Sequence, residues 1–160
     1  MSRQPNLNPF PVDPRYPVLR ASVTHRVAFS EVDPMGIVWF GNYTFFFEKV
    51  SAVLRDPLGL SHADFFRAGV QPPIVHYEVH YHRPSRLDET LTVEARLYGT
   101  DAARLNTAYR IVGADGEIRV TAQTIQVFTD PSGATCYVPP KIWTDCLERW
   151  RKGEFACLQA

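Results

Sequence analysis

The residues best suited to chemistry lie in one segment, 33–43, which reads Asp-Pro-Met-Gly-Ile-Val-Trp-Phe-Gly-Asn-Tyr. It places the Asp33 carboxylate in a tight turn, a few residues before the predicted start of a helix. The start of a helix offers unpaired N–H groups and a partial positive charge, which polarise a carbonyl and stabilise an oxyanion. A carboxylate close to such groups suits acyl transfer, because it serves as a general base or as a nucleophile.

A structural interpretation of the same segment is simpler, and the residue types alone favour it. Asp33 and Pro34 would only shape a turn, and Asn42 would only cap the helix that follows. Preference for the chemical interpretation therefore has to come from the order of the residues rather than from their types.

A long helix is predicted directly after this segment. Apolar residues recur there at spacings of three and four, which gives a helical stripe made of Tyr43, Phe46, Phe47, Val50 and Leu54. We expect Asn42 to be the N-cap and Asp-Pro-Leu-Gly at 56–59 to end the helix. Because Phe45 adds apolar bulk beside the stripe, the helix is expected to be buried on most sides.

Most of the other predicted elements are strands. Val23, Val27 and Phe29 share one face of a strand that precedes the segment. A short second helix is predicted at 61–69, and a C-terminal amphipathic helix at 140–152. Between them, four strands are predicted over 73–82, 89–99, 103–112 and 117–129. The apolar face of the strand at 73–82 is formed by Val75, Tyr77, Val79 and Tyr81. That of the strand at 89–99 is formed by Leu91, Val93, Ala95 and Leu97.

This order of elements indicates the α+β class. Ala-Asp-Gly at 114–116 is a hairpin turn signal, so the last two long strands are expected to pair antiparallel. An antiparallel sheet wrapped around the long central helix buries the apolar stripe of the helix and one face of the sheet together.

Length, charge and cysteine content exclude several classes of protein. The chain has 160 residues, which suggests one domain. Seventeen Lys and Arg balance seventeen Asp and Glu, which argues against a generic nucleic-acid binder. We expect no membrane span, because no apolar run approaches about 20 residues, and no signal peptide, because the N-terminus leads into prolines. Three cysteines indicate reduced thiols and a cytoplasmic protein, because their number is odd for a disulfide framework and their spacings do not suit zinc; they are Cys136, Cys146 and Cys157.

The order of residues in 33–43 resembles the signature of the 4-hydroxybenzoyl-CoA thioesterase family of hotdog-fold enzymes. Asp33 stands where that family has its catalytic aspartate. Two groups match the residues leading into the family's central helix, Gly36-Ile37-Val38-Trp39 and Asn42-Tyr43. The resemblance covers roughly 23–150 and continues through Val79-x-Tyr81-x-x-Pro84-x-x-Leu87-Asp88, Arg104-Leu105 and Arg110-Ile111-Val112.

The resemblance implies hydrolysis of an acyl-CoA thioester, with an aromatic acyl group such as hydroxybenzoyl or benzoyl as the candidate. Asp33 would attack the thioester carbon directly or activate water, and both routes stay open. The backbone amides of Phe40 and Gly41 would lie near the helix start and polarise the carbonyl. Substrate-binding roles are expected for Gly36, Ile37, Trp39, Tyr43, Ile74, Val75 and Arg104.

The family also implies the cofactor requirement, the assembly and the domain limits. Coenzyme A is part of the substrate and leaves as a thiol, so no metal and no other cofactor is expected. A homodimer or homotetramer is expected, because the sheets of the family pair edge to edge and the substrate tunnel lies between two subunits. The expected divisions are a proline-rich arm at 1–22, a hotdog domain at 23–152 and a tail at 153–160.

Two features depart from the family pattern. Phe40 stands where a related branch, with short-chain and cell-envelope roles, typically has a histidine, and this favours the aromatic-acyl branch. The stretch 99–101 is Gly-Thr-Asp rather than a basic cluster suited to coenzyme A phosphates. Arg104 or Arg110 would have to take the place of that cluster at the rim of the site.

Other titratable residues give weaker signals. One face of a predicted strand carries His76, Glu78, His80 and His82, which suits a metal site or, more simply, the polar face of a sheet. Glu48 lies on the central helix, where another hotdog branch places a catalytic glutamate, but a structural or interface hydrogen bond is the favoured role. Solvent-facing or capping roles are expected for His25 and His62.

Two alternatives to a thioesterase remain at this point. A hotdog dehydratase or hydratase normally moves protons with a histidine and an acid, and 33–43 contains no histidine. A non-catalytic acyl-ligand binder would keep the pocket without needing the carboxylate, since a fold alone does not fix a function.

Overall fold

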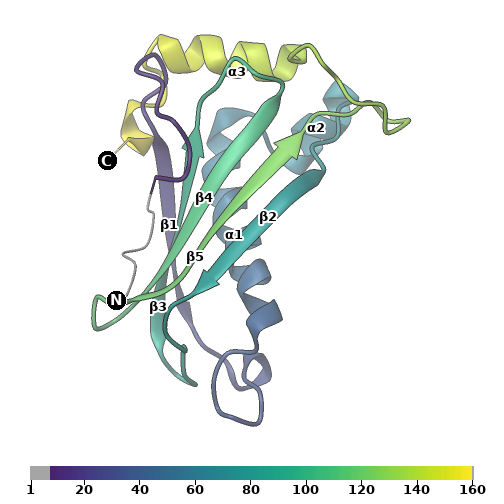
Figure 1. Cartoon of the computed structure of the whole chain (residues 1–160). Coiled ribbons are helices and arrows are strands. Elements are labelled where there is room, and N and C mark those ends of the chain that lie inside the picture. Colours follow the sequence, from purple (N-terminus) through teal and green to yellow (C-terminus); the bar gives the residue numbers. More distant parts are fainter. Residues whose placement is uncertain (1–7, 160) are drawn as a thin grey trace.

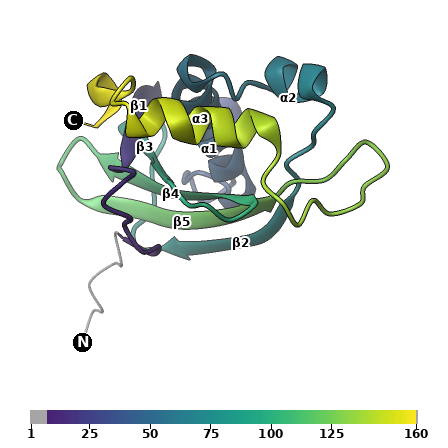
Figure 2. The ribbon, with the colours of Figure 1, turned by 90° about the horizontal axis from the view of Figure 1, so that it is seen from above.

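The computed structural model describes residues 8–159, and its central feature is a five-stranded antiparallel sheet in the order β1-β3-β4-β5-β2 (Figure 1). The strands are β1 (Leu19–Arg26), β2 (Ile74–Tyr81), β3 (Thr90–Tyr98), β4 (Arg104–Gly113) and β5 (Ile118–Val127). The helices are α1 (Tyr43–Arg55), α2 (His62–Ala68) and α3 (Lys141–Arg151), all on the same side of the curved sheet (Figure 2). An antiparallel sheet around a central helix is the hotdog arrangement predicted from the sequence, and it is confirmed.

Helix α1 packs on one half of the sheet. Its predicted apolar stripe is buried, and this stripe contacts mainly β1 and β3 rather than the middle of the sheet. The expectation that the helix is buried on most sides was wrong, because the side facing away from the sheet is open. Phe45, for example, is 58% exposed. This stripe therefore provides most of the attachment of α1 to its own sheet, together with the Ser51–Tyr109 hydrogen bond to β4.

The inner face of the sheet forms the rest of the core. The predicted face of β3 is fully buried, and it consists of Leu91, Val93, Ala95 and Leu97. Strand β2, at the edge of the sheet, pairs with β5 and has an irregularity between Ile74 and His76. This bulge breaks the alternation predicted for β2, since an extra residue at position 75 shifts the pairing register.

The first strand differs from its prediction in position. It begins at Leu19 and ends at Arg26, where it pairs with Thr90 at the start of β3. Phe29 lies beyond it in a short 3₁₀ turn, Phe29–Glu31, and is 82% exposed. Alternation alone could not show that the chain leaves the sheet after Val27.

Helix α3 covers one end of the sheet. The indole of Trp143 donates to the Thr100 carbonyl at 3.1 Å, and that of Trp150 donates to the Pro17 carbonyl at 2.9 Å. All three cysteines are free, and burial raises the pKa of the Cys146 thiol to about 12. Within residues 8–159, no helix has the length and apolar character needed to cross a bilayer.

The packing of α1 gives a stability prediction. Leu54 is 1% exposed and Val53, its neighbour, is 49% exposed. We expect Leu54→Ala to lower the free energy of unfolding by about 2–5 kcal/mol, because it leaves a cavity under the helix. Val53→Ala, the matched control, should stay within about 0.5 kcal/mol of the parent. Urea denaturation measures both, and equal losses in the two variants would contradict the described packing of α1.

Candidate functional site

Asp33 occupies a tight turn, as its sequence predicts. The Gly36 amide donates to the Asp33 carbonyl at 2.9 Å, and Gly36 has a φ of +72°, which glycine adopts without strain. The carboxylate Oδ1 accepts a hydrogen bond from the Met35 amide at 2.8 Å. Oδ2 has no hydrogen bond to the described part of the chain, so one carboxylate oxygen stays available.

Backbone hydrogen bonds anchor this turn to the fold on two sides. The Asp33 amide donates to the Ile37 carbonyl at 2.9 Å, and the Val38 amide donates to Ser85 in the β2–β3 connection at 2.8 Å. An isolated bridge also joins Ile37 to Arg86. The position of the carboxylate is therefore fixed by the backbone rather than by a flexible loop.

The chain then enters α1 through a 3₁₀ turn, Phe40–Asn42. The amides of Phe40 and Gly41 precede the first intrahelical bonds, and neither has an acceptor among residues 8–159. Asn42 is at the predicted N-cap position of α1, but its side chain makes no capping hydrogen bond. Because the 3₁₀ turn gives Asn42 a helical backbone, its side chain instead donates to the Glu31 carbonyl at 2.8 Å.

Trp39 lies directly over Gly41. A Cβ atom at position 41 would overlap the six-membered ring of the Trp39 indole, so only glycine leaves room for this arrangement. The Trp39 and Phe40 rings lie 4.9 Å apart, and both are largely exposed. The start of the helix thus presents two aromatic rings beside its unpaired amides.

A cavity of about 310 Å³ joins the carboxylate to the helix start. Four of the predicted site residues line it, namely Asp33, Ile37, Phe40 and Tyr43. Gly36 and Trp39 belong to the same loop but shape it rather than line the cavity, as does Gly41. The structure thus brings most of the predicted site together at one end of α1.

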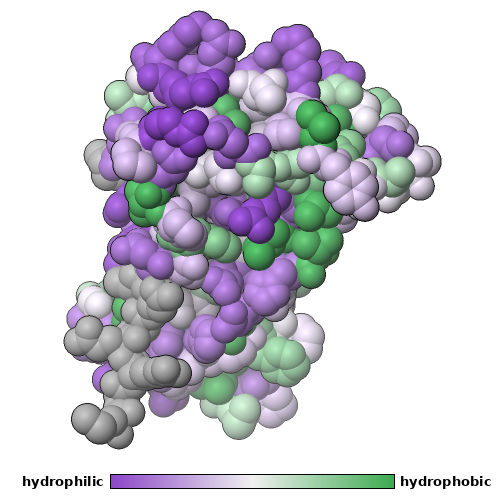
Figure 3. Space-filling model, turned by 45° about the horizontal axis from the view of Figure 1, so that its top comes forward, coloured by the Kyte–Doolittle hydropathy of each residue, from purple (hydrophilic) through white to green (hydrophobic). Residues whose placement is uncertain are grey.

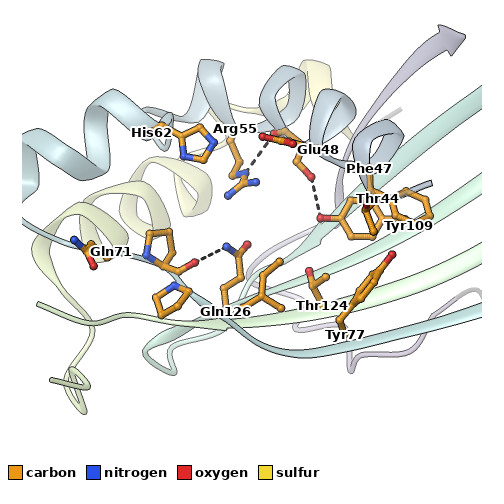
Figure 4. Close-up of a pocket in the computed structure, with 14 residues that line it drawn as sticks. Thr44, Phe47, Glu48, Arg55, His62, Gln71, Tyr77, Tyr109, Thr124 and Gln126 are labelled. Carbon is orange, nitrogen blue, oxygen red and sulfur yellow. Dashed lines mark hydrogen bonds between the residues drawn. The ribbon is translucent and has the colours of Figure 1, made fainter. Parts of the chain in front are cut away.

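The remaining predicted residues lie elsewhere. Ile74 lines a second cavity of about 540 Å³, between α1 and the β2–β5 part of the sheet (Figure 4). Val75 is in the β2 bulge and lines neither cavity. Arg104, at the start of β4, also lines neither cavity, and so lies apart from the other candidates.

Three residues at the end of β2 line the Asp33 cavity but were not predicted to do so: Tyr81, His82 and Arg83. The Tyr81 hydroxyl donates to the Phe40 carbonyl at 3.3 Å, and its ring packs on Tyr43. Burial and, secondarily, His80 lower the pKa of His82, whose Nε2 lies 2.8 Å from the Thr121 hydroxyl. The resemblance covered Tyr81, but the sequence did not indicate that this strand ends beside Asp33.

The polar face of β2 carries contacts between its histidines and Glu78. His80 Nε2 lies 2.7 Å from the Glu78 carboxylate, and His76 Nε2 lies 3.6 Å from it. Among residues 8–159, no group of three or more histidine, cysteine or acidic side chains is arranged to hold a metal ion.

Glu31 connects the loop to the sheet, through a contact that the sequence analysis missed. Its backbone carbonyl accepts from the Trp39 amide at 2.9 Å as well as from Asn42. Its carboxylate lies 2.8 Å from both the Ala28 amide and His25 Nε2. Burial raises the pKa of the Glu31 carboxyl, but these hydrogen bonds outweigh it and hold that pKa below its usual value. His25 is therefore paired rather than solvent-facing.

The cavity is lined by Asp33, whose Oδ2 is free, and by Phe40, whose amide is unpaired within residues 8–159, and the unpaired Gly41 amide follows directly in the chain. Such a set stabilises negative charge on a carbonyl oxygen and supplies a base or nucleophile for its carbon. That chemistry needs no change in the protonation of His82, the histidine that lines the cavity. The arrangement is suited to acyl transfer.

Comparison with known proteins agrees with this chemistry. The sequence model of a family described as the thioesterase-like superfamily matches residues 27–144. YneP of Bacillus subtilis, whose name assigns it provisionally to the acyl-CoA thioesterases, is 28% identical over 104 residues, or 65% of this chain and 75% of YneP. A 1,4-dihydroxy-2-naphthoyl-CoA hydrolase of Synechococcus elongatus is 28% identical over 103 residues, or 63% of this chain and 75% of the hydrolase.

The solved structure of a DHNA-CoA thioesterase from Staphylococcus aureus has the same fold. It superposes with a TM-score of 0.73 at 20% identity and covers 84% of this chain and 93% of its own.

The Glu31 contacts give a pH-dependent prediction. Because the pKa of Glu31 is lower in the folded chain than its usual value of 4.5, its stabilisation is present above pH 4.5 and lost as the pH falls through the folded pKa. We expect Glu31→Gln to lower the free energy of unfolding by about 1–2 kcal/mol at pH 7. The difference from the parent should shrink in acid.

Denaturant titrations at several pH values measure this difference. Glu148→Gln is the control, because Glu148 forms only an exposed pair with Lys152 on α3. A pH-independent difference for Glu31→Gln would show that the Glu31 carboxylate does not hold the loop.

Proposed function

Because the chain belongs to the thioesterase-like superfamily, we propose that it is a hydrolase that cleaves an acyl-CoA thioester to a carboxylic acid and coenzyme A. One observation carries this proposal. Asp33, with its free carboxylate oxygen, lines the same cavity as Phe40, the first of the two residues with unpaired amides at the start of α1. The names of the curated relatives, an acyl-CoA thioesterase and a naphthoyl-CoA hydrolase, support the substrate class.

In the proposed reaction, the thioester carbonyl oxygen faces the Phe40 and Gly41 amides at the start of α1. These amides stabilise the negative charge that develops when the carbonyl carbon is attacked. Asp33 either attacks that carbon itself or takes a proton from the water that does. The C–S bond then breaks, and the sulfur leaves as the coenzyme A thiol after gaining a proton. A covalent route ends with water cleaving the acyl–Asp33 anhydride.

An aromatic acyl group is the first candidate for the substrate. Phe40, Tyr43 and Tyr81 give the Asp33 cavity an aromatic lining, which suits a flat ring by offset or edge contacts. The naphthoyl-CoA hydrolase among the relatives is consistent with such a substrate. Hydrolysis of this kind needs only water, so the proposal includes no metal or other cofactor.

The proposed working unit is a homodimer or a homotetramer. β2 is an edge strand and therefore presents unpaired backbone groups. Hydrophobic surface gathers along the side of the molecule where β2 lies (Figure 3), and the exposed apolar residues of this strand are Ile74, Val75, Tyr77 and Tyr81. Pairing of this edge with β2 of a second copy would cover both the backbone groups and the apolar side chains.

The catalytic proposal is tested by Asp33→Asn. We expect a loss of about 10²–10⁴-fold in kcat, because the amide keeps the turn but supplies no base or nucleophile. Thiol release from benzoyl-, hydroxybenzoyl-, phenylacetyl- and straight-chain acyl-CoAs measures turnover. Asp130→Asn is the matched control, because Asp130 shapes a similar turn outside both cavities.

Other outcomes would favour the rival functions. Ligand-dependent melting shifts in both the parent and Asp33→Asn, without turnover of any thioester, would indicate a binding protein. Hydration of an enoyl-CoA that is lost in His82→Gln would indicate a hydratase, since His82 lies in the same cavity. Unchanged thioester turnover in Asp33→Asn would mean that another residue is catalytic.

The assembly proposal is tested by Val75→Asp. We expect light scattering to give a multiple of the chain mass for the parent and a smaller particle for the variant, because a charge on β2 disfavours pairing of two edges. Val12→Asp is the control, since Val12 is similarly exposed but lies in the N-terminal arm. A parent protein that is monomeric at micromolar concentration would contradict the proposal.

A further inference from the structure

The larger cavity, of about 540 Å³, takes no part in the proposed chemistry at Asp33, and its lining residues differ from those of the Asp33 cavity. It exists because α1 packs on β1 and β3, which leaves the inner face of β2 and β5 uncovered. A second stripe of α1 faces this opening, made of Thr44, Phe47, Glu48, Ser51 and Arg55. The opposite wall comes from β2, β4 and β5.

The two cavities follow the same seam between α1 and β2. Tyr43 lines the Asp33 cavity and Thr44, the next residue, lines the larger one. On β2, Tyr81 lines the Asp33 cavity and Tyr77 lines the larger one, and both side chains face the same side of the strand. The two cavities share no lining residue, but they follow one another along α1 and β2, so the larger cavity lies in the direction that an acyl group extending from Asp33 along the helix would take.

The middle of the larger cavity is mainly apolar. The Phe47 and Tyr109 rings pack there in a tilted arrangement with centroids 4.7 Å apart, and the Tyr109 hydroxyl is already paired with Ser51 at 2.8 Å. Burial raises the pKa of Tyr77 to about 12, so its phenol is neutral. These walls suit the hydrocarbon body of an acyl group.

The end of the cavity farthest from Asp33 is polar. Arg55 and His62 point into it from the helix side, and Gln126 points into it from the sheet (Figure 4). Gln126 is held in place by its hydrogen bond to the Pro72 carbonyl, at 2.5 Å. The cavity thus changes from apolar walls to hydrogen-bonding groups along its length.

Arg55 is the unused cation at this end. Its Nε makes one long hydrogen bond, 3.4 Å, to the Ser51 carbonyl in the last turns of α1. Within residues 8–159, it forms no ion pair with any carboxylate. The two terminal nitrogens of the guanidinium, which bind carboxylates in a forked geometry, are therefore left for a ligand.

Thr124 gives an independent indication that something polar enters. Its side chain is 97% buried, lines the same cavity, and has a hydroxyl with no hydrogen-bond partner among the described residues. A buried hydroxyl without a partner is unfavourable. Because Thr124 pairs with Tyr77, this hydroxyl lies in the middle of the cavity, where an oxygen on the body of the acyl group would satisfy it, and not at the Arg55 end.

The one acidic residue of the cavity is placed away from Arg55. Glu48 precedes Arg55 by seven residues, which corresponds to about 10 Å along the helix axis. Negative charge at the Arg55 end therefore meets a cation first, while the acid lies nearer the catalytic end.

We propose that the larger cavity receives the acyl group and that Arg55 binds a carboxylate at its far end, so that the preferred substrates are thioesters of dicarboxylic acids. This inference rests on the proposed thioesterase function and specifies its substrate class. The body between the two carbonyl carbons is apolar, either aliphatic or aromatic.

The parent protein provides the first test. Succinyl-, adipyl-, suberyl- and sebacyl-CoA are compared with the length-matched butyryl-, hexanoyl-, octanoyl- and decanoyl-CoA. At the best chain length we expect kcat/KM for the carboxylated substrate to exceed that of its neutral counterpart by about 10- to 100-fold, the range for one charge-assisted hydrogen-bond pair. A preference for the neutral member at every length would overturn the proposal.

Arg55→Gln provides the second test. We expect it to lower kcat/KM for the best carboxylated substrate by about 10- to 100-fold and to leave the neutral counterpart within about twofold. Arg55→Lys should keep part of the preference, because it retains the charge but not the fork. Arg67→Gln is the matched control, since Arg67 occupies the last turn of α2 outside the cavity. Equal losses on both substrates would mean that Arg55 acts only on the structure.

A binding measurement separates this proposal from the thioesterase proposal. Calorimetric titration with suberate and with octanoate needs no turnover, and only suberate binding should weaken in Arg55→Gln. Hydrolysis that depends on Asp33 but shows no preference for a carboxylate would contradict the proposed substrate class and support the thioesterase proposal. Absence of hydrolysis, together with suberate binding that depends on Arg55, would contradict the thioesterase proposal but support carboxylate binding at Arg55. Absence of both would overturn both proposals.

Discussion

The packing of one stripe of α1 on β1 and β3 is the contact on which the remaining structure depends. The helix brings five large side chains to the inner face of the sheet, and this burial holds it off-centre. Two consequences follow from the off-centre position. The N-terminus of α1 meets the end of β2, where the Asp33 cavity forms, and the other half of the sheet stays open as the larger cavity. A helix centred on the sheet would have closed both.

The loop before α1 is held by backbone groups as much as by side chains. The Glu31 carbonyl accepts two hydrogen bonds from the loop, and its carboxylate is tied to Ala28 and His25. This arrangement fixes a carboxylate beside unpaired amides without a metal-type cluster in the described chain. Backbone dipoles that are already oriented stabilise a developing charge most strongly in a cavity with little water. The same rigidity explains why Gly36 and Gly41 stand at their positions, one for its φ and one for the space under Trp39.

Sequence patterns predicted most elements within a few residues but failed where the chain leaves regular structure. The helix stripe and the inner face of β3 were correct, because periodicity reports which side of an element is apolar. Asn42 stands at the N-cap as predicted but makes no capping hydrogen bond, and the predictions of Phe29 as a strand residue and of a helix buried on most sides were wrong. Each outcome depends on surroundings that periodicity does not include. These are the 3₁₀ turn before the helix for Asn42, the point where β1 ends for Phe29, and the half of the sheet that α1 leaves open for the burial of the helix.

The sequence by itself determined the fold class, the family and the loop that carries Asp33, because local spacing and residue order encode all three. Only the tertiary structure decided which distant residues join that loop. Tyr81 and His82 arrive there because β2 runs antiparallel to β5 and ends beside the start of α1. Arg55 and Thr124 share a cavity for a related reason, since helix and strand meet there across more than sixty residues of chain. Such meetings follow from packing, and spacing along the chain does not encode them.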